Sequence, residues 1–334
     1  MLAISSSSAR QHHIKYSLGT IEPGATSGSF HRPAGVTFDH ARGLLYVVDS
    51  GNHRVQVFRS LDGSFVTSIN PTPAFLWPWS VAVDSERELV VVADSSKHRL
   101  QLLDANRYES LKHIGYPAHA FRFPRGVAID AHRGRLVVAD SNNHRVLVLE
   151  PSEYACEFTV DASVGDVRGV CVDPLLDRLI IVDSFNDRVM VASASDGSLL
   201  FEINNDTGTL LRGPRSVCVD SLSRIIVACA VDRAIRVFSA DGELLSTLPW
   251  PEAPPEGVAL DELRGLVAIS AGNQVHVLEA ESCLSSRWRP DRHCYASEAT
   301  KSVVLAMTMV RSIAVESPVS LLPNELLFEI YQYL

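Results

Sequence analysis

The chain has 334 residues, of which 46% are hydrophobic and 21% are charged, which is typical of a globular protein and excludes a disordered or fibrous chain. A chain of this length can bury a large core, so its folding does not depend on disulfides or metal. The formal net charge of −9, from 30 basic and 39 acidic residues, lowers the expectation of nucleic-acid binding, which needs a basic face.

Cysteine spacing and hydropathy indicate a cytoplasmic protein. The six cysteines form no C-x-x-C pair, and Cys171, Cys218 and Cys229 stand in apolar runs, as reduced buried thiols do. Residues 1–10 contain no apolar stretch of signal-peptide length. The apolar run 303–310 is far shorter than the roughly 20 residues that cross a bilayer. We therefore expect neither secretion nor a membrane partner.

In chain order, the pattern begins with a short strand-like segment and continues as a repeat. Residues 1–11 are predicted to be disordered, and residues 12–21 contain the strand-like run Ile14 to Gly19. A unit of about 45 residues then recurs, and its first apolar segment ends each time in an aspartate. These aspartates are Asp39, Asp84, Asp130, Asp173, Asp220 and Asp261. Six copies fit between residues 30 and 282.

A second marker follows in the same register. It reads Asp-Ser at Asp49, Asp94, Asp140 and Asp183. The marker fades to Cys229-Ala230 in the fifth unit and to Ile269-Ser270 in the sixth, so the last two copies are degenerate.

The composition of the unit predicts strands only. Short runs rich in Val, Ile and Leu, such as Leu89 to Val92, are bounded by Asp, Ser, Asn and Gly, and no helical period of 10 to 15 residues separates them. Several strands per unit, repeated six times, predict an all-β, six-bladed β-propeller.

Three strings in the first three units carry a family resemblance. They are Asn52-His53-Arg54-Val55, Lys97-His98-Arg99-Leu100 and Asn143-His144-Arg145-Val146. Each follows Asp-Ser and an earlier Pro-x-Gly-Val or a close variant, so the region of residues 12–282 resembles NHL repeats. The fourth unit departs from this pattern with Asn186-Asp187-Arg188, and the last two units lack the histidine. The resemblance implies a six-bladed propeller.

A propeller needs its last blade to find an outer strand, because an open sheet edge invites aggregation. The segment Ile14 to Gly19 precedes the first Pro-x-Gly marker as Ser64 to Ile69 precedes the second. We therefore expect residues 12–21 to supply the closing strand and to pair with the blade formed by Leu260 to Leu278.

The residues that recur in every unit are expected to serve the scaffold. An aspartate after an inner strand can accept backbone amides and fix the turn. His53, His98 and His144 occupy equivalent places on successive blades, too far apart for a shared metal ion, so no metal site or cofactor is expected. The arginine after each histidine is expected to bond loop carbonyls or the nearby aspartates.

The position between Pro and Gly varies from unit to unit. It holds Ala34, Trp79, Arg125, Arg168, Arg215 and Glu256. Because the inner strand starts at the rim of the central channel, these side chains are expected to ring one mouth. Trp79, Arg125, Arg168 and Arg215 would then form an arc that binds an acidic peptide or another anion. The alternative is that each arginine pairs with a neighbouring loop aspartate such as Asp140 or Asp183.

The tail after residue 282 has a different pattern. Residues 283–297 are predicted to be a connector and residues 298–334 a helical tail. In residues 317–334 the opening Leu322-Pro323-Asn324-Glu325-Leu326-Leu327 resembles the first helix of an F-box. Its predicted apolar face consists of Leu326, Leu327, Ile330, Tyr333 and Leu334. This helix either docks an adaptor or caps the propeller.

The sequence favours a non-enzymatic protein-interaction scaffold. In this reading the channel mouth binds one protein partner and the tail docks another, the adaptor of a cullin-type ubiquitin ligase. Three alternatives stay open: a six-bladed lyase or hydrolase with bound calcium or zinc, an RNA-binding NHL propeller, and a protein that does nothing beyond self-assembly. No metalloprotease, hydrolase-elbow or phosphate-loop motif is present, although propeller enzymes can assemble a site from scattered residues.

Overall fold

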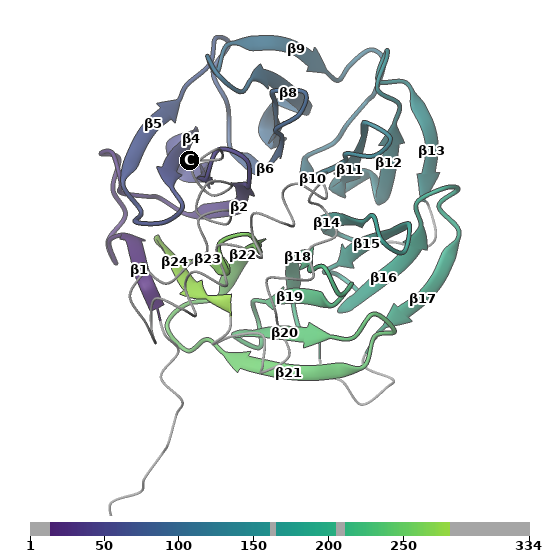
Figure 1. Ribbon diagram of the computed structural model, residues 1–334. Coiled ribbons are helices and arrows are strands. Elements are labelled where there is room, and N and C mark those ends of the chain that lie inside the picture. Colours follow the sequence, from purple (N-terminus) through teal and green to yellow (C-terminus); the bar gives the residue numbers. More distant parts are fainter. Residues whose placement is uncertain (1–13, 161–164, 205–210, 281–334) are drawn as a thin grey trace, which may run out of the picture.

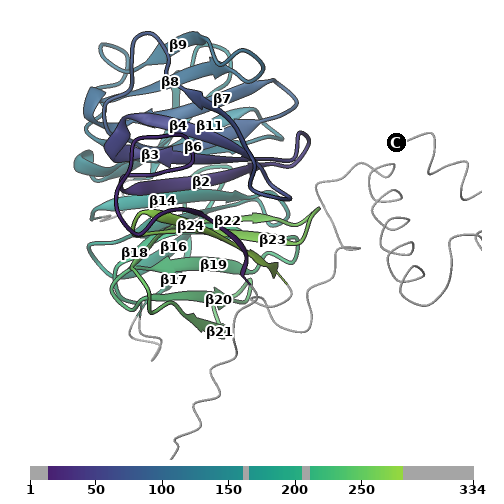
Figure 2. The same cartoon turned by 90° about the vertical axis from the view of Figure 1, so that its left-hand side faces the viewer.

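The computed structural model describes residues 14–160, 165–204 and 211–280. Within these residues the chain forms six four-stranded antiparallel sheets arranged around a central axis (Figure 1). Seen from the side, the sheets stack as the blades of a disc (Figure 2). The predicted all-β, six-bladed propeller is therefore confirmed. The predicted disordered segment 1–11, the connector 283–297 and the helical tail 298–334 lie outside the described residues.

Each blade runs from an inner strand at the axis to an outer strand at the rim. The inner strands are β2 (Pro33–Asp39), β6 (Pro78–Asp84), β10 (Pro124–Asp130), β14 (Val167–Asp173), β18 (Pro214–Val219) and β22 (Pro255–Asp261). The second strands are β3 (Leu44–Asp49), β7 (Leu89–Asp94), β11 (Arg135–Asp140), β15 (Arg178–Asp183), β19 (Ile225–Cys229) and β23 (Leu266–Ala271).

The remaining strands complete the blades. The third strands are β4 (Arg54–Arg59), β8 (Arg99–Asp104), β12 (Arg145–Leu149), β16 (Arg188–Ser193), β20 (Ala234–Phe238) and β24 (Gln274–Glu279). The outer strands are β5 (Phe65–Ile69), β9 (Ser110–Ile114), β13 (Cys156–Val160), β17 (Leu199–Ile203), β21 (Leu244–Pro249) and β1 (Ile14–Gly19). Three short 3-10 turns follow the second strands: η1 (Ser50–Asn52), η2 (Ser95–Lys97) and η3 (Ser141–Asn143).

The core lies between the blades. Six hydrophobic clusters fill the six interfaces between adjacent sheets, including the one between the sixth blade and the first. The middle strands are therefore buried on both faces, which explains why β3 and β11 are continuous apolar runs rather than alternating ones. No helix within the described residues is long and apolar enough to span a membrane.

The ring is closed by its N-terminal segment. Strand β1 pairs antiparallel with β24, with Leu18 opposite Val275. Tyr16 donates its hydroxyl to the carbonyl of Ser60 in the first blade at 2.6 Å, so the closing strand also contacts its other neighbour.

Contacts between blades recur at both ends of the inner strands. We call the end where the inner strands begin the mouth end and the end where they finish the turn end. At the mouth end, serine hydroxyls donate to the next blade's backbone in five of the six interfaces: Ser50 to Pro78, Ser95 to Pro124, Ser141 to Val167, Ser184 to Pro214 and Ser270 to Ala34. In the remaining interface Ser216 accepts the amide of Val258 instead.

The turn end is closed by a second ring of contacts. These link Ser85 to Asp39, Arg87 to the carbonyl of Ala131, Arg133 to Asp177, Ser223 to Asp173, the amide of Ser221 to Glu262, and His40 to Asp261. Both ends of all six interfaces are therefore tied by polar contacts.

His276 makes the closing blade sensitive to pH. Its ring lies on β24, with Nδ1 2.8 Å from the hydroxyl of Ser17 on β1. Burial lowers the pKa of His276, against the weaker opposite effect of the Glu252 charge, so the folded protein favours the neutral ring.

Lowering the pH should therefore weaken ring closure through His276. The unfolded chain takes up a proton at the ordinary pKa of about 6.5, whereas the folded protein does so only at lower pH. The neutral His276 ring thus makes its full contribution to the unfolding free energy above pH 6.5. This contribution is lost as the pH falls from there through the lowered pKa of the folded protein. Urea unfolding between pH 7.5 and 5.5 should show a shallower loss of unfolding free energy in His276→Gln than in the wild type. Equal slopes would contradict this role.

Candidate functional site

The buried aspartate at the end of the second strand organises the mouth end. Asp140 is fully buried and accepts the amide of Arg122, the side-chain amide of Asn143 and the Nε of Arg145, at 2.6, 2.8 and 2.9 Å. The same pattern holds at Asp49, Asp94 and Asp183, each of which accepts an amide 18 residues upstream and the Nε of an arginine five residues downstream. Each aspartate thus fixes the loop that enters its own inner strand.

The fifth blade reaches the same arrangement with other residues. Cys229 occupies the aspartate's position, opposite Pro214. Asp232 accepts the amide of Arg212 at 3.0 Å and pairs with Arg236 at 2.9 Å. The copy that is degenerate in sequence therefore keeps a carboxylate–arginine pair, with the carboxylate displaced by three residues and the arginine by two.

In the sixth blade, the sequence register placed Ile269-Ser270 at the Asp-Ser marker. Strand pairing instead puts Ala271 opposite Pro255, which makes Ala271 the equivalent of the aspartates. The predicted register is therefore wrong by two residues in this blade.

The repeated histidines join neighbouring blades. His53 and His98 adopt a left-handed conformation and accept the amides of Trp77 and Phe123 through Nδ1, both at 3.1 Å. His144 donates to the carbonyl of Gly165 at 2.8 Å. Asp187, which replaces histidine in the fourth unit, accepts the amide of Gly213 at 2.7 Å. No group of three or more His, Cys, Asp or Glu residues within the described chain is arranged to hold a metal ion.

Two substitutions of His98 test whether its contact with the amide of Phe123 stabilises the fold. His98→Ala removes the acceptor for Phe123 and places alanine at φ 53°, so we expect a loss of about 2 kcal/mol in unfolding free energy. His98→Asp follows the example of Asp187 and should cost less than about 1 kcal/mol, because aspartate keeps an acceptor and tolerates this backbone conformation. Chemical denaturation measures both variants. Equal losses in the two would contradict the role assigned to the histidine.

In all six blades, the variable position is the second residue of the inner strand. The inner strands approach one another closely there: a side chain on Gly126 would lie 2.7 Å from the carbonyl of Arg168, and one on Gly169 would lie 2.9 Å from the carbonyl of Arg215. Arg125, Arg168 and Arg215 thus come from three successive blades at the mouth end, and Trp79 comes from the blade before them.

The three arginines meet two carboxylates. Asp166 lies between two of them and accepts Nη1 of Arg125 with both oxygens at 2.8 Å and Nε of Arg168 at 2.8 Å. Arg215 pairs with Glu256 across the next interface, at 2.5 Å. The guanidinium of Arg125 also stacks over Trp79, 5.1 Å from the ring centroid. These five charged groups leave one positive charge in excess.

The internal pairing of the arginines agrees with the alternative given in the sequence analysis, but the partners are Asp166 and Glu256 rather than Asp140 or Asp183. Asp140 and Asp183 do not neutralise the arc, because they bind Arg145 and Arg188 together with backbone amides. Asp166 was missed because it stands where the preceding units carry Trp77 and Phe123, directly before the inner strand. Glu256 was recognised as a member of the ring but not as a partner of Arg215.

Arg168 is the least neutralised member. Only its Nε has a partner within the described residues, and its two terminal nitrogens have none there. Burial and the charge of Arg125 lower the pKa of Arg168, against the attraction of Asp166, and the charge of Arg215 adds to the lowering. About a fifth of its side chain remains exposed. The geometry therefore offers a partly buried guanidinium fork to an incoming anion.

Comparisons with known proteins agree with the propeller. The family model described as "NHL repeat" matches residues 30–58, 75–101 and 121–149, which are the first three blades. These three segments are therefore similar to NHL repeats. A chain in the structure titled "Crystal structure of Nidogen/Laminin Complex" is similar in fold, with a TM-score of 0.59 and 17% identity, covering 69% of this chain and 85% of that one. No curated protein sequence matches.

Proposed function

We propose that this NHL propeller is a non-enzymatic protein-interaction scaffold whose mouth end binds an acidic segment of a partner protein. The binding residues are Trp79, Arg125, Arg168 and Arg215. The observation that carries the proposal is the excess charge at Arg168, a partly exposed side chain whose two terminal nitrogens have no partner among the described residues and which lies beside a stacked Trp79–Arg125 pair. Arginine and tryptophan are the residues that most often anchor protein partners.

The internal carboxylates set the strength of such a site. Asp166 and Glu256 neutralise most of the arginine charge in the absence of a partner, so no large unpaired charge is buried. An incoming carboxylate would add a counterion next to Arg168 and Arg215. The expected affinity is therefore moderate, and it should depend on ionic strength.

We also propose a second contact through the tail. Residues 317–334, with the predicted apolar face of Leu326, Leu327, Ile330, Tyr333 and Leu334, resemble the F-box opening and would dock the adaptor of a cullin-type ubiquitin ligase. The scaffold would then hold a partner at the mouth near that ligase. The free thiols of Cys156, Cys171, Cys218 and Cys229 support a reducing, cytoplasmic setting.

Two substitutions at the mouth should change anion binding in opposite directions. The probe is a fluorescein-labelled peptide of alternating Glu and Trp, titrated by fluorescence anisotropy at 50 mM and 200 mM salt. Arg168→Gln should weaken binding by about tenfold, a change of roughly 1.4 kcal/mol. Asp166→Asn should strengthen binding, because it frees both Arg125 and Arg168. Arg122→Gln, an exposed arginine on the same end but outside the arc, is the control and should change affinity less than twofold.

Three outcomes count against the proposal. The first is unchanged affinity in Arg168→Gln with normal thermal stability. The second is weaker binding in Asp166→Asn. The third is tighter binding of a single-stranded oligouridine than of the peptide, which would favour the RNA-binding alternative. A chain ending at residue 316 should keep its peptide affinity and lose a purified F-box adaptor, which separates the two contacts.

A further inference from the structure

The turn end of the fourth and fifth blades exposes leucines in two rows. The inner row lies in the turns after the inner strands and consists of Leu175, Leu176 and Leu222. The outer row opens the outer strands and consists of Leu199, Leu200, Leu244 and Leu245. Each of the seven is between 36% and 51% exposed. We call these seven residues the leucine sector.

Strand pairing puts both rows at the same end. In the fourth blade, Asp173 pairs with Arg178, and Arg178 pairs with Ser193. Leu199 pairs with Ala192, beside Ser193. The hydroxyl of Ser223 then joins Asp173 across the interface at 3.0 Å, so the turns of the fourth and fifth blades are neighbours.

The other blades do not combine both rows. At the position of Leu176, three residues after the inner-strand aspartate, four blades carry an arginine: Arg42, Arg87, Arg133 and Arg264. The first blade has apolar Phe65 and Val66 in its outer row, but its inner turn is polar. Among the described residues, only the fourth and fifth blades expose leucines in both rows.

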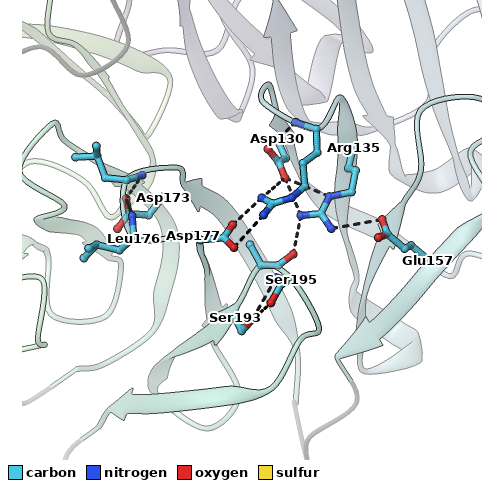
Figure 3. A network of polar contacts seen from close by, with 11 residues as sticks. Asp130, Arg135, Glu157, Asp173, Leu176, Asp177, Ser193 and Ser195 are labelled. Atoms are coloured by element: carbon cyan, nitrogen blue, oxygen red, sulfur yellow. Dashed lines mark hydrogen bonds and ion pairs between the residues drawn. The ribbon is translucent and has the colours of Figure 1, made fainter.

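The contacts that hold the turns of the propeller do not require leucines at these positions. Asp173 is held by Arg178 at 2.8 Å and accepts the backbone amides of Leu175 and Leu176, and Asp130 is held by Arg135 at 2.7 Å (Figure 3 shows Asp173 with Leu176 and Asp130 with Arg135). The side chain of Leu176 therefore makes no polar contact with Asp173. Asp130 also receives Arg133 from the position equivalent to Leu176, which shows that the turn accommodates an arginine there. An exposed leucine in place of that arginine indicates a surface that something covers.

The place where the chain leaves the propeller indicates which segment covers the leucine sector. Glu279 lies opposite Leu266, which pairs with Asp261, so the chain leaves β24 at the turn end of the sixth blade. The amide of Ala280 bonds there to the carbonyl of Gly265 at 2.8 Å. The turn of the sixth blade touches that of the fifth through Glu262 and the amide of Ser221, at 2.6 Å. The described chain therefore ends at Ala280 on the same end of the propeller as the leucine sector, in the blade next to the fifth.

We propose that the leucine sector is the intramolecular docking site of residues 317–334. The predicted apolar face of this segment needs a cover, and the leucine sector is an apolar surface at the end of the propeller where the segment departs. The proposal goes beyond the mouth-end function, because it concerns the opposite end of the ring. It also adds regulation, since an adaptor that binds the segment must first displace it from the propeller.

Hydrogen–deuterium exchange of the full chain tests the docking. In the wild type, peptides from residues 321–334 should exchange at least tenfold more slowly than a synthetic peptide of residues 317–334. The variant Leu176→Arg/Leu222→Glu introduces residue types that other blades carry at these positions, and it should remove that protection. Leu222→Glu alone should remove part of it. Leu111→Arg, an exposed leucine on the outer strand of the second blade, is the matched control and should leave it unchanged.

The propeller peptides report whether the variants fold, because their exchange should match the wild type. Three results would overturn the proposal: exchange of residues 321–334 at the rate of the free peptide, protection that survives the double variant in a folded propeller, and protection that disappears on tenfold dilution. The last result would mean that a second copy of the chain covers the leucine sector.

Discussion

The structure depends on a buried carboxylate in each of the first four blades that must be paired with the loop entering that blade. Asp49, Asp94, Asp140 and Asp183 are fully buried, and each is satisfied by a backbone amide and an arginine Nε. A buried carboxylate without such partners would be strongly destabilising. The loops at the mouth end therefore take up one conformation, and that conformation determines where the inner strands begin.

The position of the arc follows from this constraint. The loop that Asp140 fixes leads directly into β10 and places Arg125, and the loop that Asp183 fixes contains Asp166 and places Arg168. The scaffold thus sets the spacing of the arginines, while their identity is free to vary. Function can reside at positions such as these because the repeat does not fix which side chain they carry.

The architecture could be read from the sequence because it depends on repetition. Asp39 and its equivalents and the apolar second strands recur in register, and the segment Ile14 to Gly19 supplies the outer strand that the last blade lacks. The charge balance at the mouth could not be read, because it depends on contacts across blades. Asp166 and Glu256 lie 41 residues from their partners Arg125 and Arg215. A local pattern instead pointed to Asp140 and Asp183, which have other partners.

The most direct test of this account is the unfolding free energy of Asp140→Asn, measured by urea denaturation with amide exchange of residues 120–126. Asparagine can still accept the amide of Arg122 but leaves the half-buried Arg145 without its counterion. The account predicts a loss of about 2 kcal/mol or more and faster exchange of the entering loop, with unchanged exchange at the turn end. Wild-type stability and an equally protected loop would show that the buried carboxylate does not organise the mouth.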